Sequence, residues 1–308
     1  MSKEAFEKAR SEVGVIDTMI GFPVPREEQR KHYDFIRKQT NDADSQEWEF
    51  PAQYMFKGVP HYDEVPDPVE MLMAKMNQHG ITKALTGMAV DGNAKIALER
   101  YPDRFIASTN CDPNQGMDAV RKLDEDVRVH GAKAAHCWGT GLIPQVPLND
   151  KKMYPIYAKC VELDVPIMLY AGVPGPRILM GAQAVALLDE VCWYFPELKI
   201  VVRHGAEPWT ELMVKLLLKW PNLYYSTSAF APKHYPADII NFANTRGADK
   251  IIYAGYYSAG LSLDRIFEEL PNVPFRDHVW PKFLRENALR VFKIPETIER
   301  ATGRPFGS

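Results

Sequence analysis

The sequence has no apolar stretch of the roughly 18 residues that a membrane-spanning helix requires. Its 37 basic and 40 acidic side chains leave a net charge of −3, so it lacks the basic surplus that favours nucleic-acid binding. Only four cysteines occur, none in a CxxC pair, which is typical of reduced thiols in the cytosol. Residues 1–10 are charged and lack the apolar core of a secretory signal. We therefore expect a cytoplasmic protein with no membrane or nucleic-acid partner.

A glycine-rich phosphate-binding turn is also missing, because Gly14 and Gly21 do not form a GxGxxG motif. The chain instead alternates short apolar segments with amphipathic ones. This order predicts a (β/α)8 TIM barrel in one domain over residues 1–308, with an open doubly wound sheet as the alternative. The predicted strands are 13–20, 82–88, 105–110, 132–138, 165–170, 199–204, 222–226 and 250–256. Helices are predicted at 67–78, 93–100, 117–130, 153–163, 182–195, 207–220, 236–244 and 276–292, the last closing the barrel.

An insertion at about residues 22–66 separates the first strand from the next helix. Its aromatic and charged residues alternate with proline and glycine at no steady period. A loop this long inside a compact domain is usually functional. Two interpretations remain open, a lid over the barrel mouth and a subunit contact in a homodimer.

Candidate catalytic residues stand at strand ends, where the active sites of TIM barrels are built. His204 is a candidate general acid or base, since the usual pKa of histidine is near neutral pH. Tyr170 and Tyr256 are candidate donors to a carbonyl or a developing oxyanion. Asp17 either orients an imidazole or is a buried carboxylate that accepts backbone bonds. Side chains alternate along a strand, so we expect Arg203 to face away from the pocket and pair with an acid.

Four further residues are candidates for substrate binding. Met19 follows the first strand and is expected to line the pocket. Arg177 follows a Pro-Gly loop and is interpreted either as an anchor for a substrate carboxylate or as a solvated cation. His136 ends the fourth strand, where it either contacts substrate or packs against a neighbouring tryptophan. Tyr257, beside the eighth strand, completes the set.

The strand-end segments resemble those of the amidohydrolase 2 (amidohydrolase-related) family, which includes aminocarboxymuconate-semialdehyde decarboxylase and related decarboxylases and lactone hydrolases. Residues 15–21 are similar to the family's first-strand Asp-x-His-x-His, and residues 166–172 to its fifth-strand run ending in His. Residues 200–205 resemble the sixth-strand His-Gly, and residues 250–257 the eighth-strand Gly-Ser-Asp segment. Residues 283–292 resemble the closing Asn-Ala helix. The resemblance covers nearly the whole chain and implies a barrel with a metal centre.

The metal-ligand positions that this resemblance implies carry different residues here. Met19, Gly21 and Tyr170 stand where the family has histidines, and Tyr256 stands where it has aspartate. Of these positions, only His204 keeps its family residue. A tight divalent site needs about three or four N, O or S donors, which a thioether, two phenols and one imidazole do not supply. We therefore expect neither a metal nor another cofactor.

Two functions are compatible with these residues. One is an enzyme that acts on a small carboxylated or aromatic compound by metal-independent hydrolysis or carbon–carbon bond cleavage, as decarboxylases and lactonases do. The other is a non-catalytic relative whose barrel binds a ligand or serves as a partner subunit. The retained His204 favours the enzyme, and the replaced metal ligands favour the non-catalytic relative.

We predict that the purified protein contains no stoichiometric zinc or manganese, because Met19, Gly21, Tyr170 and Tyr256 replace the family's ligands. Elemental analysis of the protein measures this directly. Close to one metal per chain, removed by a chelator with loss of stability or function, would contradict it.

Overall fold

The computed structural model describes residues 2–88 and 92–295. In this part of the chain, eight parallel strands form one sheet in sequence order from β1 to β8, as expected for a TIM barrel. All eight predicted strands are confirmed. They are β1 (Val15–Asp17), β2 (Ile81–Gly87), β3 (Phe105–Asn110), β4 (Ala134–Cys137), β5 (Ile167–Tyr170), β6 (Ile200–Arg203), β7 (Leu223–Ser226) and β8 (Ile251–Ile252).

Backbone bonds beyond the ends of β1 and β8 join the first and last strands. The Thr18 amide donates to the Tyr253 carbonyl at 3.4 Å, and the Tyr256 amide donates to the Met19 carbonyl at 3.0 Å. An isolated parallel bridge pairs Ile20 with Tyr257. The segments that follow these two short strands therefore close the barrel at its C-terminal end, where the candidate residues lie.

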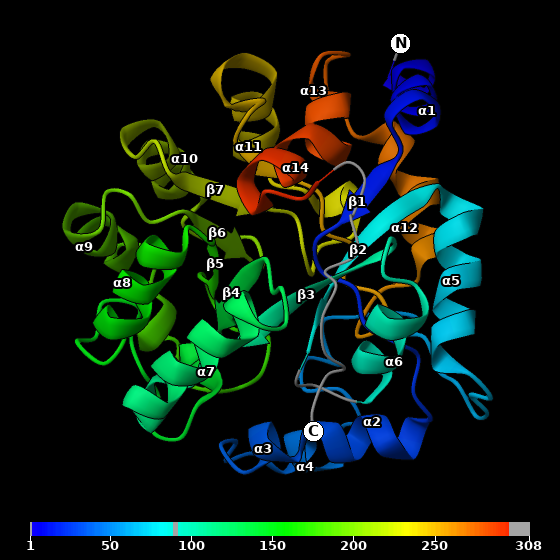
Figure 1. The fold of residues 1–308 in the computed structure, drawn as a ribbon. Coiled ribbons are helices and arrows are strands. Elements are labelled where there is room, and N and C mark those ends of the chain that lie inside the picture. Colours follow the sequence, from blue (N-terminus) through cyan, green and yellow to red (C-terminus); the bar gives the residue numbers. More distant parts are fainter. Residues whose placement is uncertain (1, 89–91, 296–308) are drawn as a thin grey trace.

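Helices surround the sheet on its outer side (Figure 1). The helix α5 shows how local sequence sets a boundary: the Asp67 carboxylate accepts from the amides of Val69 and Glu70, and Gly80 ends the helix at φ 72°. The outer helices are α1 (Ser2–Val13), α5 (Pro68–His79), α6 (Gly92–Arg100), α7 (Met117–Arg128), α8 (Tyr154–Leu163), α9 (Leu187–Tyr194), α10 (Thr210–Lys219), α11 (Ala237–Phe242) and α12 (Leu263–Glu269). The predicted terminal helix consists of α13 (Val279–Pro281), a π-helical segment (Lys282–Glu286) and α14 (Asn287–Phe292).

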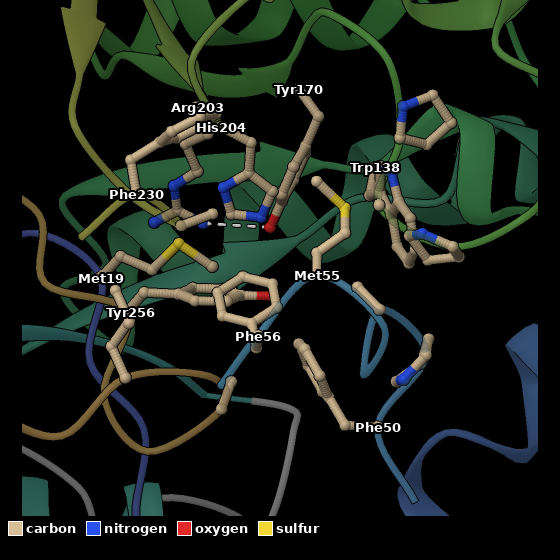
Figure 2. Close-up of a pocket in the computed structure, with 18 of the residues that line it drawn as sticks. Met19, Phe50, Met55, Phe56, Trp138, Tyr170, Arg203, His204, Phe230 and Tyr256 are labelled. Carbon is tan, nitrogen blue, oxygen red and sulfur yellow. Dashed lines mark hydrogen bonds between the residues drawn. The ribbon is translucent and has the colours of Figure 1, made fainter. Parts of the chain in front are cut away.

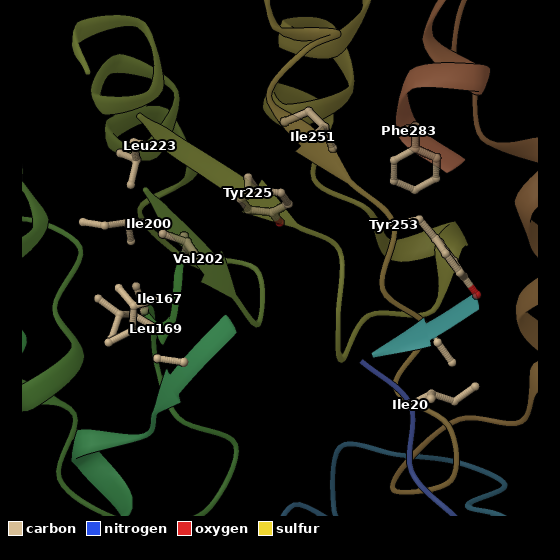
Figure 3. Packing of buried hydrophobic residues seen from close by; sticks show 14 of the residues in the cluster. Ile20, Ile167, Leu169, Ile200, Val202, Leu223, Tyr225, Ile251, Tyr253 and Phe283 are labelled. Carbon is tan, nitrogen blue, oxygen red and sulfur yellow. The ribbon is translucent and has the colours of Figure 1, made fainter. Parts of the chain in front are cut away.

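The strands bury both of their faces. Toward the helices, Ile167 and Leu169 of β5 pack with Ile200 and Val202 of β6 (Figure 3). An apolar layer inside the barrel contains one residue from each strand, and α14 packs against this layer through its own apolar side chains. The interior residues are Ile16, Leu85, Ile106, Ala134, Met168, Val201, Tyr224 and Ile252. Most of them lie early in their strands, so α14 closes the end of the barrel where the strands begin.

The insertion at residues 22–66 contains three short helices, α2 (Arg26–His32), α3 (Asp34–Arg37) and α4 (Ala43–Glu47). They gather at the end of the molecule opposite α13 and α14 (Figure 1). Gln39 donates to the Gly141 carbonyl at 2.7 Å, and the Tyr54 hydroxyl donates to the Gly175 carbonyl at 2.8 Å. The insertion is thus attached to the loops that follow β4 and β5. Its role as a subunit contact stays a prediction.

None of the helices described here is both long and apolar enough to cross a membrane.

Asn287 connects α14 to the start of β8, and its replacement provides a test of this closure. Its amide donates to the carbonyls of Ala248 and Ile251 at 2.7 and 2.8 Å, and the side chain is buried. We expect Asn287→Ala to lower the free energy of unfolding by ~2–4 kcal/mol, because two buried carbonyls lose their donor. Urea unfolding measures this change. The exposed Asn272→Ala is the control, and equal effects of the two would contradict the assignment.

Candidate functional site

A cavity of about 1010 Å³ opens at the C-terminal ends of the strands. This is the end of a TIM barrel where active sites are built. Seven of its lining residues lie near the C-terminal ends of seven different strands: Met19, Gly87, Ser108, His136, Tyr170, Arg203 and Tyr256.

His204 lies between two phenol rings in this cavity (Figure 2). The centroid of its imidazole is 4.7 Å from that of Tyr170 and 5.0 Å from that of Tyr256, and both pairs are edge-to-face. The Ser228 hydroxyl lies 3.0 Å from His204 Nδ1 and accepts a bond from the His204 backbone amide at 3.1 Å. Burial, assisted by the charge of Arg203, lowers the pKa of His204 to about 3. The imidazole is therefore neutral near pH 7.

Arg203 lies inside the cavity, so the expectation that it faces outward and pairs with an acid is wrong. Val202 points to the helices and Val201 into the barrel, so alternation places Arg203 inside. The strand ends there, and His204 has a φ of 66°, which turns the chain. The Arg203 guanidinium donates to the Tyr170 hydroxyl at 3.3 Å (Figure 2). It also donates to the Thr18 carbonyl at 2.9 Å and lies 2.8 Å from the Met168 sulfur.

His136 also lines the cavity, on β4. Its Nδ1 is 3.4 Å from the Ser108 hydroxyl. Burial and, to a smaller extent, the charges of Arg203 and Lys122 lower the pKa of His136 to about 3. The location allows His136 to contact a ligand as a neutral imidazole. That role, like the roles of Met19, Tyr170, His204 and Tyr256, stays a prediction.

Asp17 is buried but does not line the cavity. Its Oδ1 accepts from the backbone amides of Met19 and Gly255, each at 3.0 Å. Of the two interpretations of Asp17, these bonds favour the buried carboxylate that accepts backbone bonds over the carboxylate that orients an imidazole. Burial outweighs these bonds and the attraction of Arg203, and raises the pKa of Asp17 to about 7.

Arg177 and Tyr257 lie outside the cavity lining. The Arg177 guanidinium pairs with Asp42 at 2.6 Å and Asp44 at 3.2 Å, and packs over the ring of Trp48. The expected contact between Arg177 and a substrate carboxylate is therefore replaced by a link to the insertion. The Tyr257 hydroxyl lies 2.7 Å from another insertion hydroxyl, that of Tyr62. Tyr257 therefore contacts the insertion and does not line the cavity.

Aromatic residues of the insertion cover one side of the cavity, which favours the interpretation as a lid. The Phe56 and Phe50 rings lie 5.9 and 6.3 Å from the Tyr256 ring, and both line the cavity (Figure 2). Other parts of the chain add Trp138 and Phe230. The sequence analysis did not predict Ser228 and Phe230 as site residues, because no local sequence pattern shows that their loop lies beside His204.

The family model described as Amidohydrolase matches residues 16–294. The chain belongs to this family. No curated protein matches it. Among solved structures it is similar to a TIM-barrel protein from Bordetella bronchiseptica, with 20% identity, a TM-score of 0.68, and coverage of 91% of this chain and 98% of the other. These matches confirm the predicted fold and family.

Two further similar structures are decarboxylases. One is 5-carboxyvanillate decarboxylase from Novosphingobium aromaticivorans with bound manganese, at 18% identity and a TM-score of 0.64, covering 93% of this chain and 99% of that one. The other is 2,6-dihydroxybenzoate decarboxylase from Rhizobium, at 17% identity and a TM-score of 0.62, covering 91% and 98%.

The side chains in this cavity do not fit a manganese centre of the family's type. In the part of the chain that the structure covers, no three His, Cys, Asp or Glu side chains are grouped to hold an ion. Met19 offers a thioether, and burial raises the pKa of the Tyr256 phenol well above its ordinary value. A hard cation such as manganese prefers carboxylate and other oxygen ligands. Among the metal-ligand positions that the family resemblance implies, only His204 keeps the family residue.

Replacing Asp17 with asparagine tests its protonation. Native Asp17 keeps its proton up to about pH 7, whereas the unfolded chain releases it near pH 3.8. Between pH 3.8 and about pH 7, the folded protein therefore binds a proton that the unfolded chain has released. The wild type loses stability relative to Asp17→Asn as the pH rises through this window. We expect the difference in unfolding free energy between variant and wild type to grow from pH 4 to 7 in favour of the variant. A difference that is constant with pH would contradict the raised pKa.

Proposed function

We propose that this protein is a metal-independent enzyme that cleaves a carbon–carbon bond of a small aromatic acid, as decarboxylases do. The observation that carries the proposal is the neutral imidazole of His204, held between the phenols of Tyr170 and Tyr256 on the wall of a closed-ended cavity. A reaction of this kind needs an acid–base group and hydroxyl donors in the same cavity.

The walls of the cavity support an aromatic ligand. Flat side chains from the insertion and from the barrel loops line it, and aromatic rings favour offset or edge contacts with a ligand ring. These residues are Tyr33, Phe35, Phe50, Phe56, Trp138, Tyr170, Phe230 and Tyr256. The activities of two relatives, on 5-carboxyvanillate and 2,6-dihydroxybenzoate, are in keeping with this class.

Decarboxylation replaces a carboxylate with a proton. The bond from the ring carbon to the carboxylate breaks, its electron pair stays on the ring, the ring carbon takes a proton, and CO₂ leaves. Ser228 is bonded to Nδ1 of His204, which leaves Nε2 to transfer the proton. The imidazole of the ligand-free protein is neutral, because its pKa is lowered to about 3. The negative charge of a bound substrate carboxylate raises that pKa again, so that Nε2 takes the proton that it transfers from an acidic hydroxyl of the substrate. The Tyr256 phenol, whose pKa burial raises, stays protonated and donates to the developing negative charge.

A second candidate is a ligand-binding protein without turnover. The observation in its favour is that, among the positions of the family's metal site, only His204 keeps the family residue. Such a protein would use the same cavity, and a binding assay combined with a turnover assay separates the two.

If the proposed reaction is correct, His204→Ala abolishes CO₂ release from hydroxylated benzoic acids. His204→Asn does the same with less risk to folding, since asparagine tolerates the φ of 66° at this position. Tyr256→Phe lowers the rate by roughly 10²–10³-fold, as expected for the loss of one donor to an oxyanion. The measurement is CO₂ release by the chelator-treated protein. Full activity in His204→Asn would overturn the assignment of His204.

A further inference from the structure

The Arg203 guanidinium is a buried positive charge with no acidic partner in residues 2–88 and 92–295. The side chain is 6% exposed. Its neighbours are a tyrosine hydroxyl, a backbone carbonyl and a methionine sulfur, all of them neutral. Buried charges in proteins are normally paired, because leaving one unpaired is costly. The other buried arginine that the structure describes, Arg37, follows this rule by pairing with Asp34.

Asp17 does not neutralise Arg203. The two are close enough for Arg203 to lower the pKa of Asp17, but burial has the larger effect and raises it to about 7. The Asp17 Oδ1 atom accepts backbone amides and not the guanidinium. Near neutral pH a large fraction of Asp17 is therefore protonated, and Arg203 keeps its excess charge.

The cavity wall as a whole carries more positive than negative side chains. Of its lining residues, Lys57, Arg203, Lys233 and Arg265 are cationic and Glu207 is acidic. Lys233 and Arg265 pair with Glu269, which does not line the cavity. Arg203 thus remains as the buried cation that faces the cavity without a counter-ion, and the methionine sulfur beside it is only a weak acceptor.

We infer that Arg203 binds the carboxylate of an aromatic ligand and thereby selects anionic ligands over neutral ones. Its planar guanidinium presents paired N–H donors that match the two oxygens of a carboxylate. A ligand held there has its anionic group beside the rings of His204 and Tyr170 and its aromatic body against the walls (Figure 2). A role of Arg203 in turnover rests on the proposed function. The binding of a carboxylate by Arg203 does not require turnover.

The experiment compares benzoate with benzamide, which has a similar shape and no charge, by titration calorimetry. The wild type is expected to bind benzoate roughly 10- to 100-fold more tightly than benzamide, the range typical of a hydrogen bond to a charged group. In Arg203→Met this preference is lost while benzamide still binds. Arg203→Gln, which keeps an amide donor without the charge, is expected to behave similarly if the methionine variant does not fold. Arg121→Met removes an exposed arginine of α7 as a matched control and leaves the preference unchanged.

Two results would overturn the inference. One is equal binding of benzoate and benzamide by the wild type, or binding of neither. The other is an undiminished preference for benzoate in a folded Arg203 variant. Anion-selective binding without CO₂ release from any hydroxylated benzoate would reject the proposed reaction and retain Arg203 as the carboxylate anchor.

Discussion

The turn that follows β6 places the side chains of Arg203 and His204 in one cavity. Alternation along the strand puts Arg203 inside the barrel, and the φ of 66° at His204 brings the next side chain into the same space. Ser228 holds this turn through both the backbone and the ring of His204. At Gly205, φ is 84° and a Cβ would overlap the ring of Phe230, so a larger residue would disrupt the turn.

The charge of Arg203 affects the titratable groups around it. It helps burial to lower the pKa values of His204 and His136, and it opposes the effect of burial on the pKa of Asp17. The site is therefore a positive centre surrounded by neutral imidazoles and phenols. The similar 5-carboxyvanillate decarboxylase structure contains a manganese ion, and the cavity of this chain contains the guanidinium of Arg203. A guanidinium attracts an anion but does not act as a Lewis acid, so the two arrangements suit different mechanisms.

The rest of the fold forms the walls of this cavity. α14 closes the barrel behind it, and aromatic side chains of the insertion at residues 22–66 cover one side of it. The bonds from Gln39 and Tyr54 to the loops after β4 and β5 hold the insertion in place. Arg177 adds an ion pair to the same contact. These contacts hold the aromatic side chains of the insertion at the cavity wall.

The barrel, its eight strands and the closing helix could be predicted from the sequence, because the pattern of apolar residues is local and both faces of each strand must be buried. The sequence also placed His204, Tyr170 and Tyr256 at strand ends. Which polar residues face the cavity follows from contacts between distant parts of the chain. The prediction for Arg203 was wrong, because the alternation along β6 and the turn at His204 place its side chain inside the barrel. Arg177 and Tyr257 lie outside the cavity lining, because each contacts a residue of the insertion instead. The insertion residues that they contact lie far away in the sequence, so the local sequence pattern does not predict these contacts.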